Sequence, residues 1–238
     1  MKEQFDRTRL LFGDDAMEKL QNSRVAVFGI GGVGGHTVEA LVRSGIGAID
    51  LIDSDEVSIS NVNRQIIATL STVGRYKVDV MKDRIMDINP DCKVNTYKCF
   101  FLPDNKDLFD FTQYDYVVDA VDTVAAKVQL VVQAKEAGVP IISSMGAGNK
   151  INPAMFQVAD IYSTSVCPLA RVMRHEMKKR EIDKLKVVYS KEQAKKPIHE
   201  DIIQNTSAKP IPGSNAFVPS VVGLIIASEV IKDIIKCK

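Results

Sequence analysis

The sequence has no C-x-x-C pair, since its four cysteines stand alone at Cys92, Cys99, Cys167 and Cys237. A zinc site made of two such pairs is excluded, so we expect no zinc. The G-x-x-x-x-G-K-[ST] sequence of P-loop proteins is also missing, which excludes that class of nucleotide-binding protein. No apolar run is long enough to span a membrane, because a proline and charged residues interrupt the nearest candidate, residues 218–235.

The N-terminal sequence Met-Lys-Glu-Gln-Phe-Asp-Arg has no apolar segment of the kind that marks a secretory signal, which favours a cytoplasmic location. The reducing cytoplasm disfavours disulfides. The net charge is only +1, so total charge by itself indicates no polyanionic partner. With 238 residues and 45% hydrophobic content, the chain is suited to a single α/β domain over residues 1–238.

A glycine-rich turn joins an expected strand at residues 25–28 to an expected helix at residues 36–43. Its G-x-G-x-x-G glycines are Gly29, Gly31 and Gly34. Glycines at such a junction let the backbone approach a phosphate, which the free N–H groups of the helix N-terminus then bind. The turn predicts a nucleotide site but not its ligand, because proteins that bind NAD, FAD, S-adenosylmethionine or ATP can all have it.

Polar and cationic residues after the second expected strand, residues 49–52, favour a triphosphate. Asp53 ends that strand, where a carboxylate can bind ribose hydroxyls. Arg64 and Lys77 supply cations, and Asn61 and Gln65 supply polar donors, whereas a dehydrogenase needs few such groups. Fixed cations stabilise the charge that builds on phosphate oxygens when an α-phosphorus is attacked. The alternative, solvated charges on a loop, is disfavoured by the length of the motif.

The combined pattern resembles a known family. It consists of G-x-G-G-x-G, D-x-D-x-V-x-x-S-N-x-x-R-Q, G-x-x-K and D-A-x-D. It is similar to that of the ubiquitin-activating-enzyme-like adenylyltransferases and, among them, of the tRNA threonylcarbamoyladenosine dehydratases. The resemblance extends from the region of Phe5 to the last expected helix. It implies a Rossmann-like, doubly wound α/β fold that binds ATP and Mg²⁺.

The resemblance also implies roles for individual residues. The nucleotide would be bound by Gly29, Gly31, Gly32, Gly34, Asp53, Asp55, Asn61, Arg64, Gln65 and Lys77. Asp122 would hold magnesium, and Arg7 would reach the triphosphate of the partner subunit in a homodimer. Each has a simpler alternative: Asp122 as a helix cap, and Arg7 as part of a frayed basic arm, with Arg9 as the matching arginine if the motif slips by two residues.

The function implied is ATP-dependent cyclisation of N6-threonylcarbamoyladenosine in tRNA. The substrate carboxylate attacks the α-phosphorus of ATP, and the acyl-adenylate is then attacked from within the same side chain, with Arg7, Arg64, Lys77 and Asp122 as catalytic residues. One alternative is adenylation of the C-terminal glycine of a ubiquitin-like or sulfur-carrier protein. A second is a non-catalytic nucleotide-binding regulatory module. A cysteine desulfurase or sulfur-acceptor protein is an accessory partner that the resemblance suggests.

Two features of the C-terminal half leave alternatives open. Cys167 precedes Pro168, so it is either a buried thiol or a nucleophile activated by a helix N-terminus. Residues 171–196 contain ten Lys and Arg against four Asp and Glu. This basic part of a crossing segment at residues 163–212 is either a solvated helix face or a tRNA-binding surface. The candidate tRNA-binding residues are Arg171, Arg174, Lys178, Lys179 and Arg180.

Apolar runs alternate between strand and helix periodicity, which predicts a mostly parallel sheet with helices on both faces. Further strands are expected at residues 94–98, 116–122 and 139–143, with an additional one at 155–161. Further helices are expected at residues 77–88, 127–137 and 221–235, and a capping box at Asp15 is expected to open the first helix. Residues 184–212 are polar and contain prolines, which predicts a loop.

Overall fold

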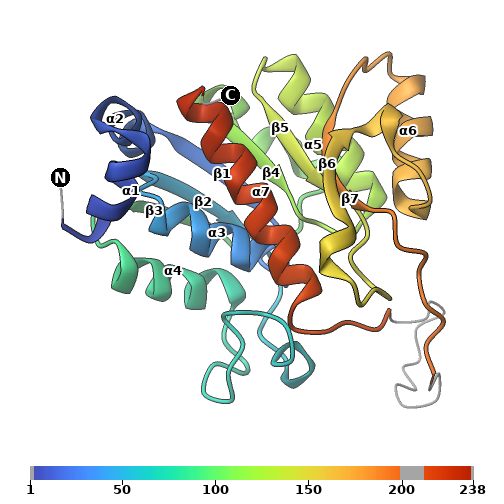
Figure 1. Ribbon diagram of the computed structural model, residues 1–238, viewed down its shortest axis with the longest axis horizontal. Helices are drawn as coiled ribbons and strands as arrows, with labels where there is room; N and C mark the ends of the chain where they lie inside the picture. The colour runs from blue at the N-terminus through green and yellow to red at the C-terminus, as the bar shows by residue number, and fades with distance from the viewer. Residues whose placement is uncertain (1–2, 199–211, 237–238) are drawn as a thin grey trace.

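The computed structural model describes residues 3–198 and 212–236 and contains one seven-stranded sheet (Figure 1). The strand order is β3-β2-β1-β4-β5-β7-β6, and every neighbouring pair is parallel except β6 and β7. The strands are β1 (Arg24–Phe28), β2 (Ala48–Ile52), β3 (Lys93–Tyr97), β4 (Tyr116–Asp119), β5 (Ile141–Ser144), β6 (Phe156–Asp160) and β7 (Lys186–Ser190). This topology confirms the predicted doubly wound α/β fold.

Helices connect the strands and cover the sheet. The α-helices are α1 (Asp6–Phe12), α2 (Asp14–Asn22), α3 (Gly34–Arg43), α4 (Lys77–Ile88), α5 (Val124–Glu136), α6 (Pro168–Lys179) and α7 (Val218–Ile235). The short 3-10 helices are η1 (Glu3–Phe5), η2 (Ile59–Asn61), η3 (Pro103–Leu108), η4 (Phe111–Gln113), η5 (Pro153–Met155) and η6 (Ile161–Ser163). Within the described residues, no helix is both long and apolar enough to cross a membrane.

Two apolar cores lie on opposite faces of the sheet. Strand β1 shows the division, because Val25 and Val27 belong to one core and Ala26 and Phe28 to the other. This alternation is the period of two that a strand buried on both faces produces. Side chains of α2, α3, α4 and α7 fill the first core, and those of α5 and α6 fill the second. Figure 1 shows α7 lying across the first face beside α3.

The order of the strands reverses at β1, because the chain goes from β1 to β2 on one side and reaches β4 on the other. In open α/β sheets, ligands bind outside the carboxyl ends of the strands at such a switch point. The glycine-rich turn after β1, the loop after β2 and the loop after β4 all begin there. The fold therefore brings the predicted nucleotide-binding residues to one edge of the sheet.

Several expected elements differ from the structure, and α5 and α7 each begin three residues earlier than expected. The segment 184–212, predicted to be a loop, contains strand β7. Polar neighbours hide this strand in the sequence, although Val187 and Val188 are fully buried in the structure. Residues 199–211 of the predicted loop lie outside the described part of the chain. The capping box at Asp15 is wrong, because α1 comes first and Gly13 precedes α2 without a side-chain cap. Strand β4 ends at Asp119 rather than at residue 122.

Candidate nucleotide-binding site

The glycines of the turn after β1 serve different purposes. A Cβ atom on Gly29, whose φ is 90°, would lie 2.7 Å from the carbonyl oxygen of Ala120, and one on Gly34 would lie 1.8 Å from the carbonyl oxygen of Gly29. These two glycines are needed for the packing of the protein itself. A Cβ atom on Gly31 would meet only the side-chain nitrogen of Gln65, at 3.9 Å. The space at Gly31 is therefore available for a ligand.

Asp53 joins the glycine-rich turn to the loop after β2. One carboxylate oxygen accepts a hydrogen bond from the backbone N–H of Ile30 at 2.6 Å, and the other accepts one from Asp55 N–H at 2.8 Å. Burial raises the pKa of Asp53, although these bonds and nearby Lys77 act in the opposite direction. The carboxylate thus has a fixed position at the carboxyl end of β2.

Lys77 places a buried ammonium group beside this carboxylate. It is the first residue of α4 and only 5% exposed. Its Nζ lies 2.6 Å from Oδ2 of Asp55 and 4.0 Å from Oδ1 of Asp53. The cation is thereby held at the site in the absence of ligand, and Asp55 is half exposed, so an anionic ligand can compete with it for the ammonium.

Arg64 is a half-buried cation whose partners are neutral. Its NH1 donates to the carbonyl oxygen of Ser60 at 2.8 Å and to Oδ1 of Asn63 at 2.9 Å. Burial lowers the pKa of Arg64. Among the residues that the structure describes, no carboxylate forms an ion pair with Arg64. A partly desolvated cation without a counter-charge favours the binding of an anion such as a phosphate.

Asn61 and Gln65 differ in what they do. The Oδ1 of Asn61 accepts a hydrogen bond from Ser58 N–H at 3.1 Å, so Asn61 orders the loop and is committed to the protein. Gln65 is 6% exposed, and its Oε1 has no hydrogen-bond partner within the described part of the chain. The hydroxyl of Ser54, beside Asp53, is also buried and unpartnered. A buried polar atom without a partner is costly, and these two belong to residues next to Arg64 and Asp53 in the chain, which is consistent with a polar ligand there.

The two acids after β4 have separate environments. Asp119 is fully buried, with both oxygens about 3 Å from Nζ of Lys127 (3.0 and 3.1 Å), so it belongs to the interior of the protein. Asp122 is exposed and accepts a hydrogen bond from the Thr123 hydroxyl at 3.2 Å. Thr123 is the residue that precedes α5, so the interpretation of Asp122 as a helix cap is wrong.

The described residues contain no group of three side chains suited to a metal, but one carboxylate with phosphate oxygens is a usual magnesium site.

Arg7 lies far from the site of its own chain. It is exposed on α1. Of the residues just before α1, Gln4 donates a hydrogen bond to the carbonyl oxygen of Ile88, at the C-terminal end of α4. Phe5 lies near Gly45, which follows the C-terminal end of α3. The nucleotide-binding residues lie at the other ends of these helices. Because α4 has twelve residues, these ends are about 18 Å apart. An arginine side chain on α1 cannot cover that distance within one subunit.

The side chain of Cys167 is only 2% exposed and lies directly before α6. Its nearest glycine is Gly146, after β5, where an added Cβ would lie 3.9 Å from the sulfur. This burial favours the interpretation of Cys167 as a packed thiol over that of a nucleophile.

The basic residues of α6 are only partly available. An NH1 of Arg174 donates to the carbonyl oxygen of Thr164 at 3.0 Å, and Arg180 and Lys179 form ion pairs with Glu176 at 2.6 and 3.4 Å. Arg171 and Lys178 are exposed, and neither forms an ion pair with an acid of residues 3–198 or 212–236. The positive surface of α6 is therefore smaller than the count of basic residues suggests.

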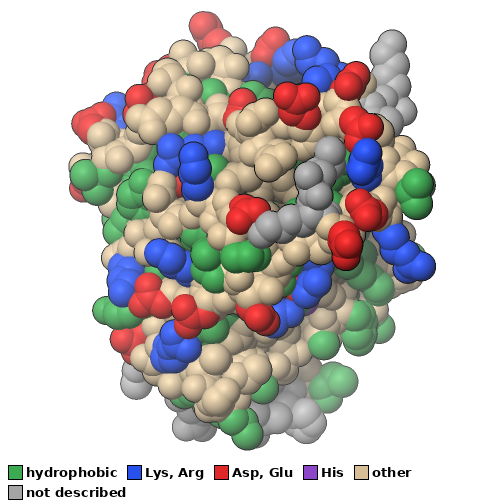
Figure 2. All heavy atoms as spheres, turned by 90° about the vertical axis from the view of Figure 1, so that its left-hand side faces the viewer, with side chains coloured by type: hydrophobic (Ala, Val, Ile, Leu, Met, Phe, Trp, Pro, Cys, Tyr) green, Lys and Arg blue, Asp and Glu red, His purple; other side chains and the backbone are tan. Residues whose placement is uncertain are grey.

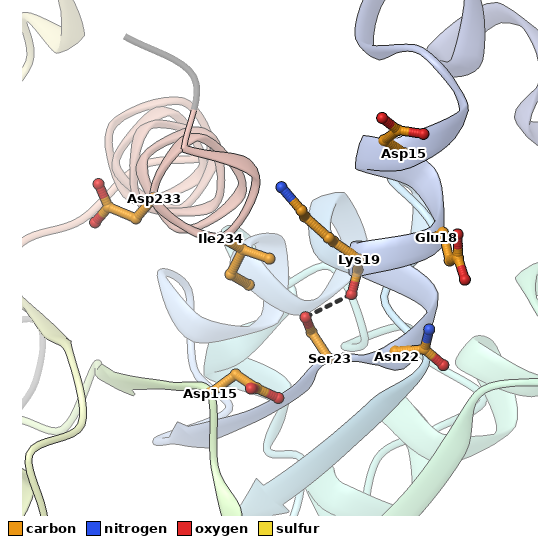
Figure 3. Close-up of a pocket in the computed structure, with 8 residues that line it drawn as sticks. All are labelled: Asp15, Glu18, Lys19, Asn22, Ser23, Asp115, Asp233 and Ile234. Atoms are coloured by element: carbon orange, nitrogen blue, oxygen red, sulfur yellow. Dashed lines mark hydrogen bonds between the residues drawn. The ribbon is translucent and has the colours of Figure 1, made fainter.

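A cavity of about 670 Å³ lies elsewhere, at the amino ends of the strands. Figure 3 shows its lining from α2, from the C-terminal part of α7 and from Asp115, which precedes β4. Figure 2 shows the face that includes α2, where acidic and basic side chains are intermixed. Most of the charged residues that line this cavity are acidic, which does not suit a triphosphate, so the carboxyl edge remains the candidate nucleotide-binding site.

A family model described as "ThiF family" matches residues 5–238. The chain belongs to this family. It is 46% identical over 244 residues to a tRNA threonylcarbamoyladenosine dehydratase of Bacillus subtilis, covering 99% of this chain and 96% of that protein. The Escherichia coli dehydratase is 41% identical over 177 residues, 74% of this chain and 66% of that protein. The crystal structure of the Escherichia coli enzyme in complex with ATP superposes with a TM-score of 0.88, at 34% identity, covering 98% of this chain and 94% of that one.

Some residues of the site were not identified from the sequence. Asn63 contacts the guanidinium of Arg64, and Ser54 contributes an unpartnered hydroxyl. Pro219, in the first turn of α7, lies against the glycine-rich turn, 3.0 Å from a Cβ built on Gly32. The proximity of Asn63 to Arg64 in the motif could have indicated its contact, but the approach of α7 is a tertiary contact without a local sequence signal.

Proposed function

We propose that the protein is a tRNA threonylcarbamoyladenosine dehydratase, which uses ATP to cyclise N6-threonylcarbamoyladenosine in tRNA. The observation that supports this most directly is the pair of cations near the glycine-rich turn, with Arg64 against Gly32 and Lys77 beside Asp53. Lys77 is buried, and Arg64 is half buried without an acidic partner. Their arrangement suits a triphosphate, and the dehydratases of Bacillus subtilis and Escherichia coli are similar to this chain.

The reaction has two steps. The threonyl carboxylate attacks the α-phosphorus of ATP, which forms an acyl-adenylate and releases pyrophosphate. A group of the same modified side chain then attacks the acyl carbon, so that a ring closes and AMP leaves. The net change in the nucleoside is the loss of one water molecule. No enzyme nucleophile is needed, which agrees with the burial of Cys167.

Each residue of the site has a proposed task in the first step. Asp53 binds the ribose hydroxyls, and the turn at Gly31 contacts the phosphates. Arg64 and Lys77 stabilise the charge that develops on the phosphate oxygens. Asp122 would hold Mg²⁺ together with those oxygens, and the ion would neutralise the charge of pyrophosphate as it leaves. Asp55 releases the ammonium of Lys77 when the nucleotide binds.

A homodimer would complete the site. Arg7 lies at the far ends of α3 and α4, so it can contribute to catalysis only in the site of a partner subunit. Mixing an Arg7→Ala chain with an Arg64→Ala chain tests this, because a heterodimer contains one site with both arginines. We expect activity to return on mixing. No recovery would exclude a role in trans.

Arg171 and Lys178 are the candidate phosphate contacts for tRNA on α6, and a cytoplasmic location accords with such a substrate. Replacing both residues with Gln should weaken tRNA binding and reduce its salt dependence without changing ATP affinity. Replacing Arg174, which binds Thr164, is the structural control. A role for a cysteine desulfurase or sulfur-acceptor protein rests on family resemblance alone.

Two other functions fit the residues less well. Adenylation of the C-terminal glycine of a ubiquitin-like or sulfur-carrier protein would use the same nucleotide site, but many such enzymes contain the paired C-x-x-C motifs that this sequence lacks. A regulatory module that only binds nucleotide has no need for two fixed phosphate cations.

The deciding experiment incubates the purified protein with ATP, MgCl₂ and tRNA that contains N6-threonylcarbamoyladenosine, followed by mass spectrometry of the nucleosides. We expect a loss of 18 Da from the modified nucleoside, which is the mass of one water molecule, and AMP in equal amount. An unchanged nucleoside together with ATP-dependent adenylation of a carrier-protein C-terminus would support the first alternative instead.

A further inference from the structure

The side chain of Asn63 joins Arg64 to a distant part of the chain. Its Oδ1 accepts a hydrogen bond from NH1 of Arg64 at 2.9 Å, and its Nδ2 donates to the carbonyl oxygen of Ser214 at 3.1 Å. One amide therefore uses its acceptor for the cation and its donor for the segment at residues 212–217, which precedes α7. Hydrogen bonds to a charged group are stronger and more directional than those between neutral groups, so the position of Asn63 affects the direction of the guanidinium.

The segment that Asn63 contacts is itself held by the loop after β5. The backbone N–H of Asn149 donates to the carbonyl oxygen of Gly213 at 2.8 Å, and Gly213 N–H donates to Oδ1 of Asn149 at 2.7 Å. Next to this pair, Nδ2 of Asn215 donates to the carbonyl oxygen of Lys150 at 2.9 Å. Three hydrogen bonds thus join residues 213–215 to residues 149–150.

Asn149 also binds the chain that follows β7. Its carbonyl oxygen accepts a hydrogen bond from Lys195 N–H at 2.8 Å. The residue has a φ of 57°, a left-handed conformation that asparagine tolerates better than most residues. Asn149 is therefore the point at which the loop after β5, the chain after β7 and the chain before α7 meet.

We propose that Asn63 is a positioning residue that couples Arg64 to this three-way junction at Asn149. The series of contacts runs from Asn149 through Gly213 and Ser214 to Asn63, and from there to the guanidinium. A displacement of residues 213–214 changes the direction in which Arg64 points. The adenylation step thereby depends on the arrangement of the chain at the carboxyl edge of β5. The inference rests on the proposed role of Arg64 at the phosphates.

Two substitutions test the coupling at its two ends. Asn63→Ala removes both hydrogen bonds, and Asn149→Gly removes the side-chain acceptor for Gly213 while it permits the left-handed backbone. We expect Asn63→Ala to lower kcat for AMP formation on modified tRNA by about 10-fold, the effect of losing one hydrogen bond to a charged group. Asn149→Gly removes a bond between neutral groups that reaches Arg64 only through Asn63, so we expect it to lower kcat by about 3-fold. The Kd for ATP should remain close to that of the unchanged protein, and the melting temperature should fall no further than it does when an asparagine with two such bonds is removed elsewhere in the protein.

Asn105→Ala is the matched control. Asn105 also uses both ends of its amide, toward Phe100 O at 2.6 Å and Leu102 N–H at 2.8 Å, but it lies in η3, away from the site. A purely structural effect of removing such an asparagine would lower the melting temperature of this variant and leave kcat unchanged.

The double variant Asn63→Ala with Arg64→Ala distinguishes positioning from an independent effect. If Asn63 acts through Arg64, the double variant is no slower than Arg64→Ala alone. A further loss of about 10-fold in the double variant would overturn the proposal, as would normal kcat in either Asn63→Ala or Asn149→Gly. Full activity of Arg64→Ala by itself would instead contradict the proposed nucleotide site, so the two failures can be told apart.

Discussion

Gly31 and Gln65 lie side by side, such that a methyl group on Gly31 would be in ordinary van der Waals contact with the Gln65 amide nitrogen, at 3.9 Å. The protein has no steric need for glycine at this position. Gly34 is the opposite case, because an added Cβ would lie 1.8 Å from the carbonyl oxygen of Gly29. Two glycines of one turn therefore have different reasons to be glycine.

Gly31→Ala should separate nucleotide binding from folding. The new methyl group occupies space that a phosphate needs, so we expect ATP affinity to fall at least about 10-fold while the melting temperature changes little. Calorimetric titration and thermal unfolding provide the two measurements. Gly34→Ala is the control and should fail to fold normally. ATP binding by Gly31→Ala at the original affinity would show that the phosphates lie elsewhere.

Lys77→Ala should reduce turnover on the order of 10²-fold, because it removes a cation from the charge that develops on the phosphates. The loss also leaves Asp53 and Asp55 without their shared counter-charge. Lys82→Ala, an exposed lysine of the same helix, is the control and should retain activity. The rate of AMP formation at saturating ATP is the measurement, and equal rates for the two variants would contradict the assignment.

Much of the fold followed from local patterns in the sequence. The buried strands β1 and β2 and the helix α4 have strong periodicity and clear ends, such as Asn89-Pro90 after α4. Strand β7 was missed because its apolar core is short and lies between charged residues, so only its pairing with β5 and β6 identifies it. Tertiary contacts decided that element, and the sequence contains no local record of them.

The motif places the cations and the Asp53 carboxylate at fixed positions along the chain, and the fold brings them to one edge of the sheet. Their roles toward a nucleotide stay predictions. The separate tasks of Asn61 and Gln65 could not be predicted, since both are short-range polar neighbours in the sequence and only packing leaves Gln65 unpartnered. The number of free cations on α6 was also overestimated from the sequence. Glu176 pairs with Lys179 and Arg180, and these contacts are visible only in the folded structure.

Cys167→Ala should retain most of the activity. The thiol is buried, and internal cyclisation needs no enzyme nucleophile. We expect kcat within a factor of about 3, with a small loss of stability from the missing sulfur contacts. Mass spectrometry of the protein during turnover is a second measurement, which should show no adduct on the cysteine. Complete loss of activity with retained ATP binding would indicate a thioester mechanism.

A pH-dependent contribution to stability is expected from Glu39, which links α3 to α4. Burial alone would raise its pKa, but hydrogen bonds from Arg84 at 2.6 and 3.0 Å and from Arg43 at 2.7 Å outweigh this, so the pKa is lowered from 4.5. A carboxyl whose pKa is lower in the folded state stabilises the fold above its unfolded pKa. This contribution disappears as pH falls from there through the folded pKa.

Glu39→Gln should therefore lower the free energy of unfolding by about 1.5–3 kcal/mol at pH 7, the range for hydrogen bonds to charged groups. The difference from the unchanged protein should narrow below about pH 4.5, the ordinary pKa of the carboxyl, because both proteins then approach a neutral side chain at this position. Urea unfolding at neutral and acidic pH gives both values.

Asp83→Asn is the control. Asp83 pairs with Arg75 on the surface, where both side chains are about half exposed or more. The loss of this pair should lower the free energy of unfolding by at most about 0.5 kcal/mol. A difference for Glu39→Gln that is equal at the two pH values would mean that the carboxylate charge has no part in joining the helices.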